Sequence, residues 1–296
     1  MSDASASPIA VVTRIMVYPV KSTRPISRTT ARIAPWGLVD DRRWAVVDDR
    51  GEKIRAKNCT SIMKITATPT PDGGLMLTAP GAPALPVTRP GAAAERTAGN
   101  RFARLDHLVV AEPAAHAWLS IVLGKPARLV WLDDPTRRRM STAHGGRQGD
   151  MLSLADVGPL LLTSASSLRL LDQWVTAESA QRGEPATAPL DMVRFRSNVV
   201  VDGCPPFAED EWKRVRIGDV PFRVSEQCDR CSVTTIDPAN LAKGDEPIRT
   251  LARHRRWAGK VWFGVRLIPD GDGDIGAARG RVAPGNFAPG LLRNGA

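Results

Sequence analysis

Two cysteines separated by two residues are the strongest chemical feature of this sequence. Cys228 and Cys231 follow an alternating apolar segment at 220–224, so a loop after a strand would present their thiols. A structural zinc site needs four ligands, and Cys59 and Cys204 would have to supply the other two, although they form no second close pair. A thioredoxin-like pair needs a helix N-terminus in a βαβ unit, whereas the residues after Cys231 look extended.

A third interpretation makes one of these thiolates a soft ligand to a redox metal. Arg230, which directly precedes Cys231, would help to keep that sulfur ionised. The remaining alternative is two ordinary buried cysteines. The sequence offers little competing catalytic apparatus, since its four histidines are scattered and no GxSxG, HExxH or P-loop motif occurs.

Cationic, hydroxyl and amide side chains recur at the ends of apolar segments. Two or three cations with such neighbours suit a phosphate, whereas singly each is the pattern of an ordinary surface charge. If these chain segments meet in a cleft, they would form an anion site. The set comprises Lys21-Ser22, Asp41-Arg42-Arg43-Trp44, Thr163-Ser164 and the segment Arg194-Phe195-Arg196-Ser197-Asn198.

The composition is typical of a packed globular chain. Of the 296 residues, 43% are hydrophobic and 24% charged. No segment approaches the roughly 20 apolar residues that cross a bilayer, so no membrane partner is expected. The N-terminus lacks the basic and apolar regions of an export signal, and four cysteines make no disulfide framework. We therefore expect a cytoplasmic protein with reduced thiols.

The net charge of +10 indicates a field that attracts anions, although a merely solvated basic surface gives the same number. The partners that such a field suits are nucleic acid, a phosphorylated cofactor or an acidic redox protein. The arginine clusters at 137–139 and 253–256 are short and have no interleaved aromatic motif, so nucleic acid is not favoured. They are candidates for docking an electron-transfer protein.

The element pattern predicts a β-rich α+β fold. Short strands with turns at 48–51 and 72–74 favour a small β-barrel domain over residues 9–90, after a disordered tail at residues 1–8. Residues 91–150 read as a connecting segment with a helix that begins near Pro113. A second β-rich domain with a few helices follows at 151–290, its helices starting after Thr163 or Ser164 and at Pro247.

The order of several motifs along the chain resembles one known family. Two motifs resemble the MOSC N-terminal β-barrel domain: Tyr18-Pro-Val-Lys-Ser22 and the segment from Gly37 through Asp41-Arg42-Arg43-Trp44 to Gly51. Others resemble the MOSC β-barrel domain that follows it: Leu161–Ala165, Arg194–Asn198, Phe207–Trp212, Ile217–Asp219, Cys228–Asp237 and Phe263-Gly264. The resemblance covers about residues 10 to 285 and extends to the mitochondrial amidoxime-reducing component and its bacterial relatives, which bind a molybdenum-pterin cofactor (molybdopterin).

This resemblance implies a set of site residues. Cys231 matches the cysteine that ligates molybdenum, so it is the expected metal ligand and catalytic residue. The implied cofactor contacts are Lys21, Ser22 and Arg42 in the first domain and Thr163, Ser164, Arg196 and Asn198 in the second. The cofactor would then lie between the domains. The chain departs from the family pattern at Ser197, which replaces a proline, and at 57–59, where relatives often carry a glutamine–arginine pair.

The resemblance further implies a molybdenum-dependent reductase of N-hydroxylated compounds, such as amidoximes, hydroxylamines and N-hydroxylated bases. The chain shows no iron–sulfur spacing, so its electrons would come from a separate ferredoxin- or flavodoxin-like protein. An alternative is a non-catalytic carrier or sulfur-delivery protein for the cofactor, because a related domain ends the cofactor sulfurases. A scaffold that has lost its metal is a third interpretation, which the retained Cys231 argues against.

Overall fold

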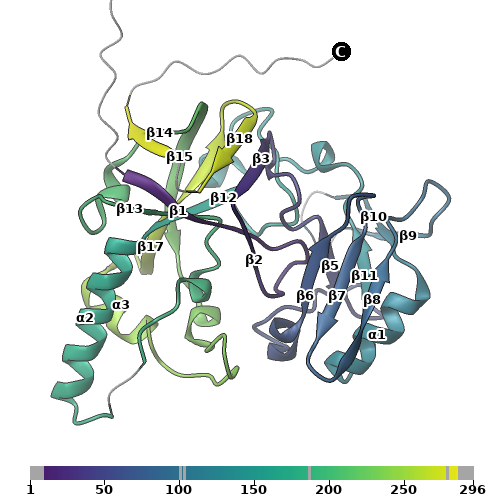
Figure 1. The fold of residues 1–296 in the computed structure, drawn as a ribbon, viewed down its shortest axis with the longest axis horizontal. Helices are drawn as coiled ribbons and strands as arrows, with labels where there is room; N and C mark the ends of the chain where they lie inside the picture. The colour runs from purple at the N-terminus through teal and green to yellow at the C-terminus, as the bar shows by residue number, and fades with distance from the viewer. Residues whose placement is uncertain (1–9, 100–101, 103–104, 186–187, 278–279, 286–296) are drawn as a thin grey trace, which may run out of the picture.

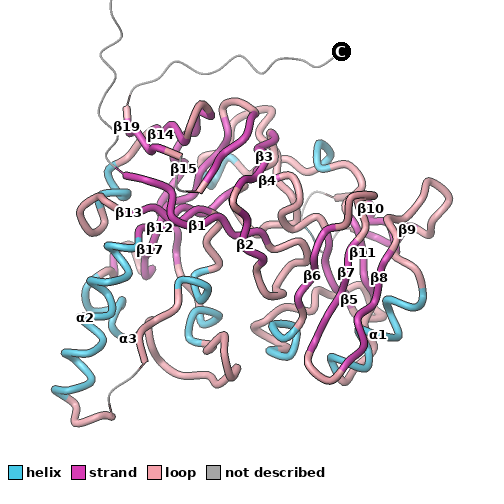
Figure 2. The backbone as a smooth tube through the Cα atoms, in the orientation of Figure 1, coloured by secondary structure: helices cyan, strands magenta, loops and turns pink. Residues whose placement is uncertain are grey.

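The computed structural model describes residues 10–99, 102, 105–185, 188–277 and 280–285. The expected tail at residues 1–8 lies outside this part of the chain. Two β-rich regions lie side by side, with the helices on their outer surfaces (Figures 1 and 2). Among the described helices, none combines the length and the apolar character needed to cross a membrane.

A closed barrel of seven strands forms the larger region. Its hydrogen-bonded order is β12-β13-β1-β19-β14-β15-β17, and antiparallel pairing of β17 with β12 closes the ring. Closure leaves no free sheet edge in the ring. The strands are β1 (Ala10–Val17), β12 (Leu160–Ser164), β13 (Val199–Asp202), β14 (Arg214–Ile217), β15 (Val220–Asp229), β17 (Lys260–Pro269) and β19 (Arg281–Pro284). Two short strands extend the sheet, β2 (Ile26–Arg28) beside β1 and β16 (Arg256–Trp257) beside β17.

Alternating apolar side chains fill the barrel. Val12, Leu162, Val199 and Val265 are all fully buried and belong to one hydrophobic cluster inside the ring. The closing pair β12–β17 also depends on Gly264, whose φ is +77°. A Cβ at this position would lie 2.7 Å from the carbonyl oxygen of Leu162, so only glycine fits there without a shift of the backbone.

Two α-helices cover one side of the barrel. Helix α2 (Ala165–Gln181) follows β12 directly, and α3 (Ile248–His254) begins after Pro247, as the sequence predicted. Their apolar faces pack on a second cluster that contains Tyr18, Phe195 and Phe263. The loops around the barrel contain the 3-10 helices η4 (Thr142–His144), η5 (Met192–Phe195), η6 (Ala208–Glu211) and η7 (Ser232–Thr235).

The smaller region consists of two sheets around one core. One sheet has the order β5-β11-β10-β9, the other β6-β7-β8, and α1 (Pro113–Leu123) contributes Trp118 and Leu119 to their shared cluster. The strands are β5 (Trp44–Val47), β6 (Thr66–Pro69), β7 (Leu75–Ala79), β8 (Ala82–Val87), β9 (Arg96–Ala98), β10 (His107–Val110) and β11 (Arg128–Trp131), with 3-10 helices η1 (Thr60–Lys64) and η3 (Pro135–Arg137).

The strands do not group in space along the linear divisions expected from the sequence. Strand β1 belongs to the larger barrel, and β3 (Thr30–Ala34) joins β4 (Gly37–Leu38) and β18 (Gly273–Gly276) in a third sheet. Residues 91–150 were expected to be a connecting segment with a helix. They also contain β9, β10 and β11, which complete the sheet of β5. The β-rich α+β class with barrel architecture is confirmed.

The expected arginine docking clusters are largely used inside the molecule. Buried Arg138 donates from Nε to the carbonyl oxygen of Phe102, and Arg137 pairs with Asp106 and Asp133. In the second cluster Arg253 pairs with Glu178 and buried Arg255 with Asp210. Arg137, Arg138, Arg253 and Arg255 are therefore engaged within the protein. Apart from Asp133, their partners are distant in sequence, so the local pattern could not reveal them.

Candidate cofactor-binding site

A cavity of about 320 Å³ is walled by residues from both β-rich regions. Strand ends, turns and η5 present most of its polar groups. Its lining includes the sequence-predicted Lys21, Ser22, Arg42, Arg196, Asn198 and Cys231, and also Arg55, Lys57, Asp156, Arg194, Cys228, Asp229, Arg230 and Arg266. Eight of these side chains are lysine or arginine and two are carboxylates. Such a lining favours a polyanionic ligand.

Cys231 lies where β15 has ended and η7 begins. It is exposed, it lines the cavity, and its backbone is extended with φ −121° and ψ 175°. The turn is fixed by Thr234, whose backbone N–H and hydroxyl donate to the carbonyl oxygen of Cys231 at 3.1 and 2.9 Å. A local turn therefore presents this thiol to the cavity, where a ligand can reach it.

Cys228 has different surroundings from Cys231. It is buried, and its Sγ accepts a hydrogen bond of 2.9 Å from Nη1 of Arg230. The other terminal nitrogen of Arg230 donates to the carbonyl oxygen of Phe195 at 2.7 Å. The guanidinium expected to stabilise the Cys231 thiolate is thus turned toward Cys228, because the extended chain sends neighbouring side chains in different directions.

The zinc alternative finds no support in the described part of the chain. No group of three or more histidine, cysteine, aspartate or glutamate side chains there is placed to hold a metal ion. Cys204 is buried in the barrel core, with its sulfur 3.5 Å from the hydroxyl of Ser164, while Cys59 packs against the core of the smaller region. A metal in this cavity would need most of its ligands from another molecule.

Two guanidiniums lie over the ring of a buried tyrosine. Arg42 lies 4.5 Å and Arg196 4.2 Å from the ring centroid of Tyr18. Arg42 pairs with buried Asp41 and donates at 3.0 Å to Oδ1 of Asn198, which also accepts from the backbone of β12. Burial raises the pKa of Tyr18 to about 12, so its ring stays neutral beside the two cations. Asn198 therefore connects the Arg42 guanidinium to strand β12 of the barrel.

Three buried donors in this wall have no partner among the described residues. They are Nη2 of Arg196, Nε of Arg194 and Nε of Arg230, although each guanidinium makes other bonds. A buried donor without an acceptor costs about 1–3 kcal/mol. Burial also lowers the pKa of Arg196 to about 10. Anionic oxygens of a bound ligand would satisfy these groups, so the residues present fit a phosphate-bearing cofactor.

Lys21 is the most buried ammonium group at the cavity. Its Nζ donates to the carbonyl oxygen of Leu154 at 2.8 Å and to Oδ1 of Asp156 at 2.7 Å. Burial lowers its pKa to about 8, against the opposing attraction of Asp156. Ser22 follows in the left-handed region with φ 74°, which turns the chain along the cavity wall. Lys21 thus still carries its charge at neutral pH.

We predict that Lys21 gives the cofactor-free protein a characteristic pH dependence of stability. The folded pKa of about 8 lies below the ordinary value of 10.5, so the unfolded chain binds the extra proton between these limits. Stability must therefore rise with pH from about 8 to 10.5 through this group. Denaturant unfolding of wild type and Lys21→Met at pH 7.5 and 10 checks this. Wild type should gain stability relative to the variant, whereas parallel behaviour would contradict the assignment.

Thr163 and Ser164 are not part of the cavity lining. Both side chains are fully buried at the end of β12. The hydroxyl of Thr163 donates to Ser197 at 2.8 Å, and the hydroxyl of Ser164 lies 2.6 Å from that of Ser166. Their hydroxyls are satisfied within the barrel, so the structure brings together the other predicted contacts but not these two.

Residues 55–57 were absent from the sequence-based site. Arg55 and Lys57 line the cavity from the smaller region. The departure from the family pattern at 57–59 was the available signal, but it could not show that this turn lines the same cavity as Cys231. Asp156 was missed because an isolated carboxylate carries no motif.

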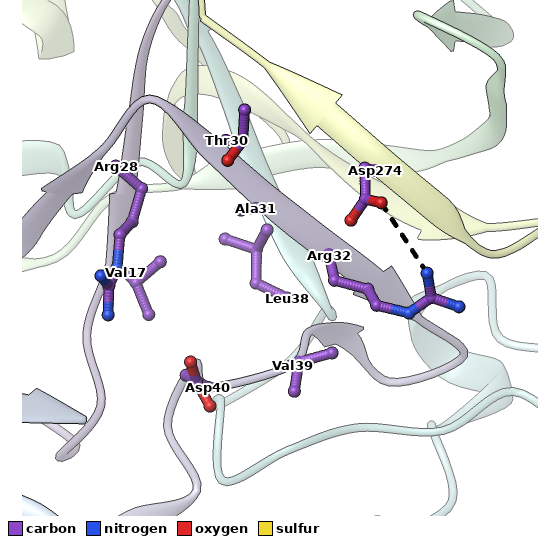
Figure 3. A pocket seen from close by; sticks show the side chains of 9 residues that line it. All are labelled: Val17, Arg28, Thr30, Ala31, Arg32, Leu38, Val39, Asp40 and Asp274. Carbon is purple, nitrogen blue, oxygen red and sulfur yellow. Dashed lines mark ion pairs between the residues drawn. The ribbon is translucent and has the colours of Figure 1, made fainter. Parts of the chain in front are cut away.

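A second cavity, of about 310 Å³, lies beside β3 and is shown in Figure 3. Its polar lining consists of Arg28, Thr30, Arg32, Asp40 and Asp274. Arg32 and Asp274 face each other there as an ion pair of 3.8 Å. It has no sulfur in its lining, so the first cavity remains the candidate site.

Comparison with known proteins agrees with this architecture. Residues 9–126 match the MOSC N-terminal beta barrel domain and residues 149–286 match the MOSC domain. The chain is 30% identical over 267 residues to the molybdenum cofactor sulfurase of Danio rerio, covering 86% of this chain and 31% of that protein. It thus spans about a third of the length of the sulfurases it matches.

A second group of relatives is matched over most of its length. The chain is 29% identical to mitochondrial amidoxime-reducing component 1 of Mus musculus over 83% of this chain and 72% of that protein. For the Homo sapiens protein the identity is 27%, over 84% and 73%. With both domain matches in order along one chain, this protein belongs to the MOSC-domain family, with a MOSC N-terminal β-barrel domain preceding its MOSC domain.

Proposed function

We propose that this protein is a molybdenum-cofactor-dependent oxidoreductase that reduces N-hydroxylated compounds with electrons from a separate protein. One observation carries the proposal: an exposed cysteine, Cys231, lies in a cation-lined cavity bounded by both domains. The relatives named amidoxime-reducing components support the choice of reaction, since they match most of both chains.

The residues around the cavity suit a pterin cofactor that carries its own metal ligands. Lys21, Arg42 and Arg196 would hold its phosphate, with Ser22 and Asn198 beside them. Cys231 would add one thiolate to the molybdenum. When bound, the cofactor supplies the two-electron redox chemistry.

The proposed reaction converts an N–OH group into N–H and releases water. It consumes two electrons and two protons for each N–O bond that breaks. The chain's contribution is binding, orientation and electrostatics. Exposure of Cys231 leaves this end of the cavity open to solvent, from which protons can enter. The electrons are proposed to come from a ferredoxin- or flavodoxin-like donor.

Turnover of benzamidoxime tests the proposal. Protein produced in a host that makes the molybdenum cofactor should convert benzamidoxime to benzamidine with a dye reductant, and also with a reduced ferredoxin or flavodoxin. Protein from a host without the cofactor is the control and should be inactive. If fully loaded protein forms no benzamidine with either kind of reductant, the proposed reaction is wrong.

A second candidate is a cofactor carrier or sulfur-delivery protein. It is favoured by the similarity to molybdenum cofactor sulfurases, which reaches 31% identity in Anopheles gambiae. Such a protein should activate an apo-enzyme by transferring its cofactor and should not turn over benzamidoxime. The cytoplasmic location expected from the sequence stays a prediction, because the amidoxime-reducing relatives carry the word mitochondrial in their names.

A further inference from the structure

The cations of the cavity fall into two sets, those with a partner inside the protein and those without one among the described residues. Lys21 pairs with Asp156, Arg194 with Asp237, and Arg266 with Glu226 and Asp229. Arg42 pairs with Asp41, while Arg196 and Arg230 donate to backbone carbonyl oxygens. Both lining carboxylates, Asp156 and Asp229, are therefore already engaged.

Arg55 and Lys57 differ from the rest of the lining. Both are exposed, both line the cavity, and within the described ranges neither forms an ion pair. They belong to the MOSC N-terminal domain, whereas Cys231 belongs to the MOSC domain. An incoming molecule that reaches Cys231 thus meets two uncompensated positive charges in the same cavity.

The turn that carries them is held in place by short-range bonds. The backbone N–H of Arg55 donates to Oδ1 of Asn58 at 2.8 Å, and the N–H of Cys59 returns to the carbonyl oxygen of Arg55 at 2.8 Å. Ala56, between the two cations, is 2% exposed and packs in the core of the smaller region. The buried alanine anchors the turn while its neighbours on both sides extend into the cavity.

We propose that Arg55 and Lys57 select N-hydroxylated substrates that carry an anionic group. This inference rests on the proposed function, since it names the substrate class of the same site. The anion is a carboxylate or a phosphate on the part of the substrate distant from its N–OH group. In the proposed function the cofactor phosphate is held by Lys21, Arg42 and Arg196, so the two anions do not compete for the same groups.

A charge series of substrates tests the proposal. Benzamidoxime, its 4-carboxylate and its 4-ammoniomethyl analogue are compared by kcat/KM with a dye reductant. The double variant Arg55→Gln/Lys57→Gln should lower the carboxylate-to-neutral ratio of kcat/KM by about fivefold, because exposed ion pairs are individually weak. Arg55→Glu/Lys57→Glu should shift the preference toward the ammonium analogue. The wild-type carboxylate preference should also fall with added salt.

Lys64→Gln is the matched control, because Lys64 is an exposed lysine of the same domain that does not line the cavity. It should keep the wild-type ratio. Molybdenum content is measured for every variant. An unchanged ratio in the double glutamine variant would overturn the proposal. So would a loss of molybdenum in that variant, which would assign Arg55 and Lys57 to the cofactor instead.

A binding measurement tests the anion selectivity independently of the proposed reaction. Isothermal titration of the holoprotein with benzamidine and with 4-carboxybenzamidine needs no turnover. If no amidoxime is reduced, the proposed function fails, and the selectivity is judged on binding alone. Tighter binding of the carboxylate by wild type, lost in the double variant, would support the inference. Equal binding of both compounds would contradict it.

Discussion

Replacement of Cys231 by alanine is expected to abolish N-reduction, with a loss of more than about 100-fold in kcat. Even the loss of a residue that only hydrogen-bonds to a metal ligand lowers metal affinity or activity by about 10- to 100-fold. Loss of the ligand itself should therefore have a larger effect. Cys231 is exposed in the cavity, and within the described part of the chain its thiol forms no hydrogen bond. The variant should therefore unfold at the wild-type denaturant concentration. Activity, metal content and unfolding are measured on the same preparation.

Cys228 provides the sharpest comparison, because it lines the same cavity three residues away. Its sulfur is buried against Arg230, so Cys228→Ala should lower activity less and act through the position of that guanidinium. Cys59 is partly buried against the core of the smaller region, so Cys59→Ala should leave metal content unchanged. Equal loss of molybdenum and activity in the Cys228 and Cys231 variants would indicate a shared site and contradict the assignment.

Loss of Arg42 is expected to destabilise the cofactor-free protein by about 3–5 kcal/mol, the usual result of stripping one partner from a buried ion pair. The side chains of Arg42 and Asp41 are only 11% and 1% exposed. In Arg42→Met, Asp41 would keep its bond to the backbone N–H of Tyr18 but lose its countercharge. Urea unfolding measures the effect, and Asp41→Asn should recover part of the loss. If the losses of unfolding free energy in Arg42→Met and Asp41→Asn simply add in the double variant, the two side chains are not paired.

A variant at Arg196 should distinguish an effect on cofactor binding from an effect on folding stability. Among the described residues it pairs with no carboxylate, and one of its terminal nitrogens has no partner. Arg196→Met should therefore cost less folding stability than Arg42→Met while lowering pterin occupancy, which is measured by fluorescence after oxidation. Wild-type occupancy in this variant would place the phosphate elsewhere in the cavity.

The sequence predicted the parts of the site that motifs encode. Cys231, Lys21, Arg42 and Asn198 were identified from their segments, and the fold brings all four to one cavity. Side-chain direction was not predictable. Thr163 lies at a strand end, as expected, yet its hydroxyl bonds to Ser197 inside the barrel.

Strand pairing could not be predicted from the local sequence pattern either. Alternation along residues 10–17 indicates a strand but does not specify its partners, which are β13 and β19 from the second half of the chain. The same limit hid the role of Arg55 and Lys57. Only the packing of the two domains places their turn at the cavity that contains Cys231.

X-ray absorption at the molybdenum edge tests the central claim most directly. The holoprotein is compared with Cys231→Ala, each produced in a cofactor-competent host and analysed for molybdenum and pterin. We predict molybdenum and pterin in equal amounts in wild type, and one fewer sulfur ligand per molybdenum in whatever metal the variant retains. An identical sulfur coordination in both proteins, or wild-type protein that contains neither molybdenum nor pterin, would contradict the account.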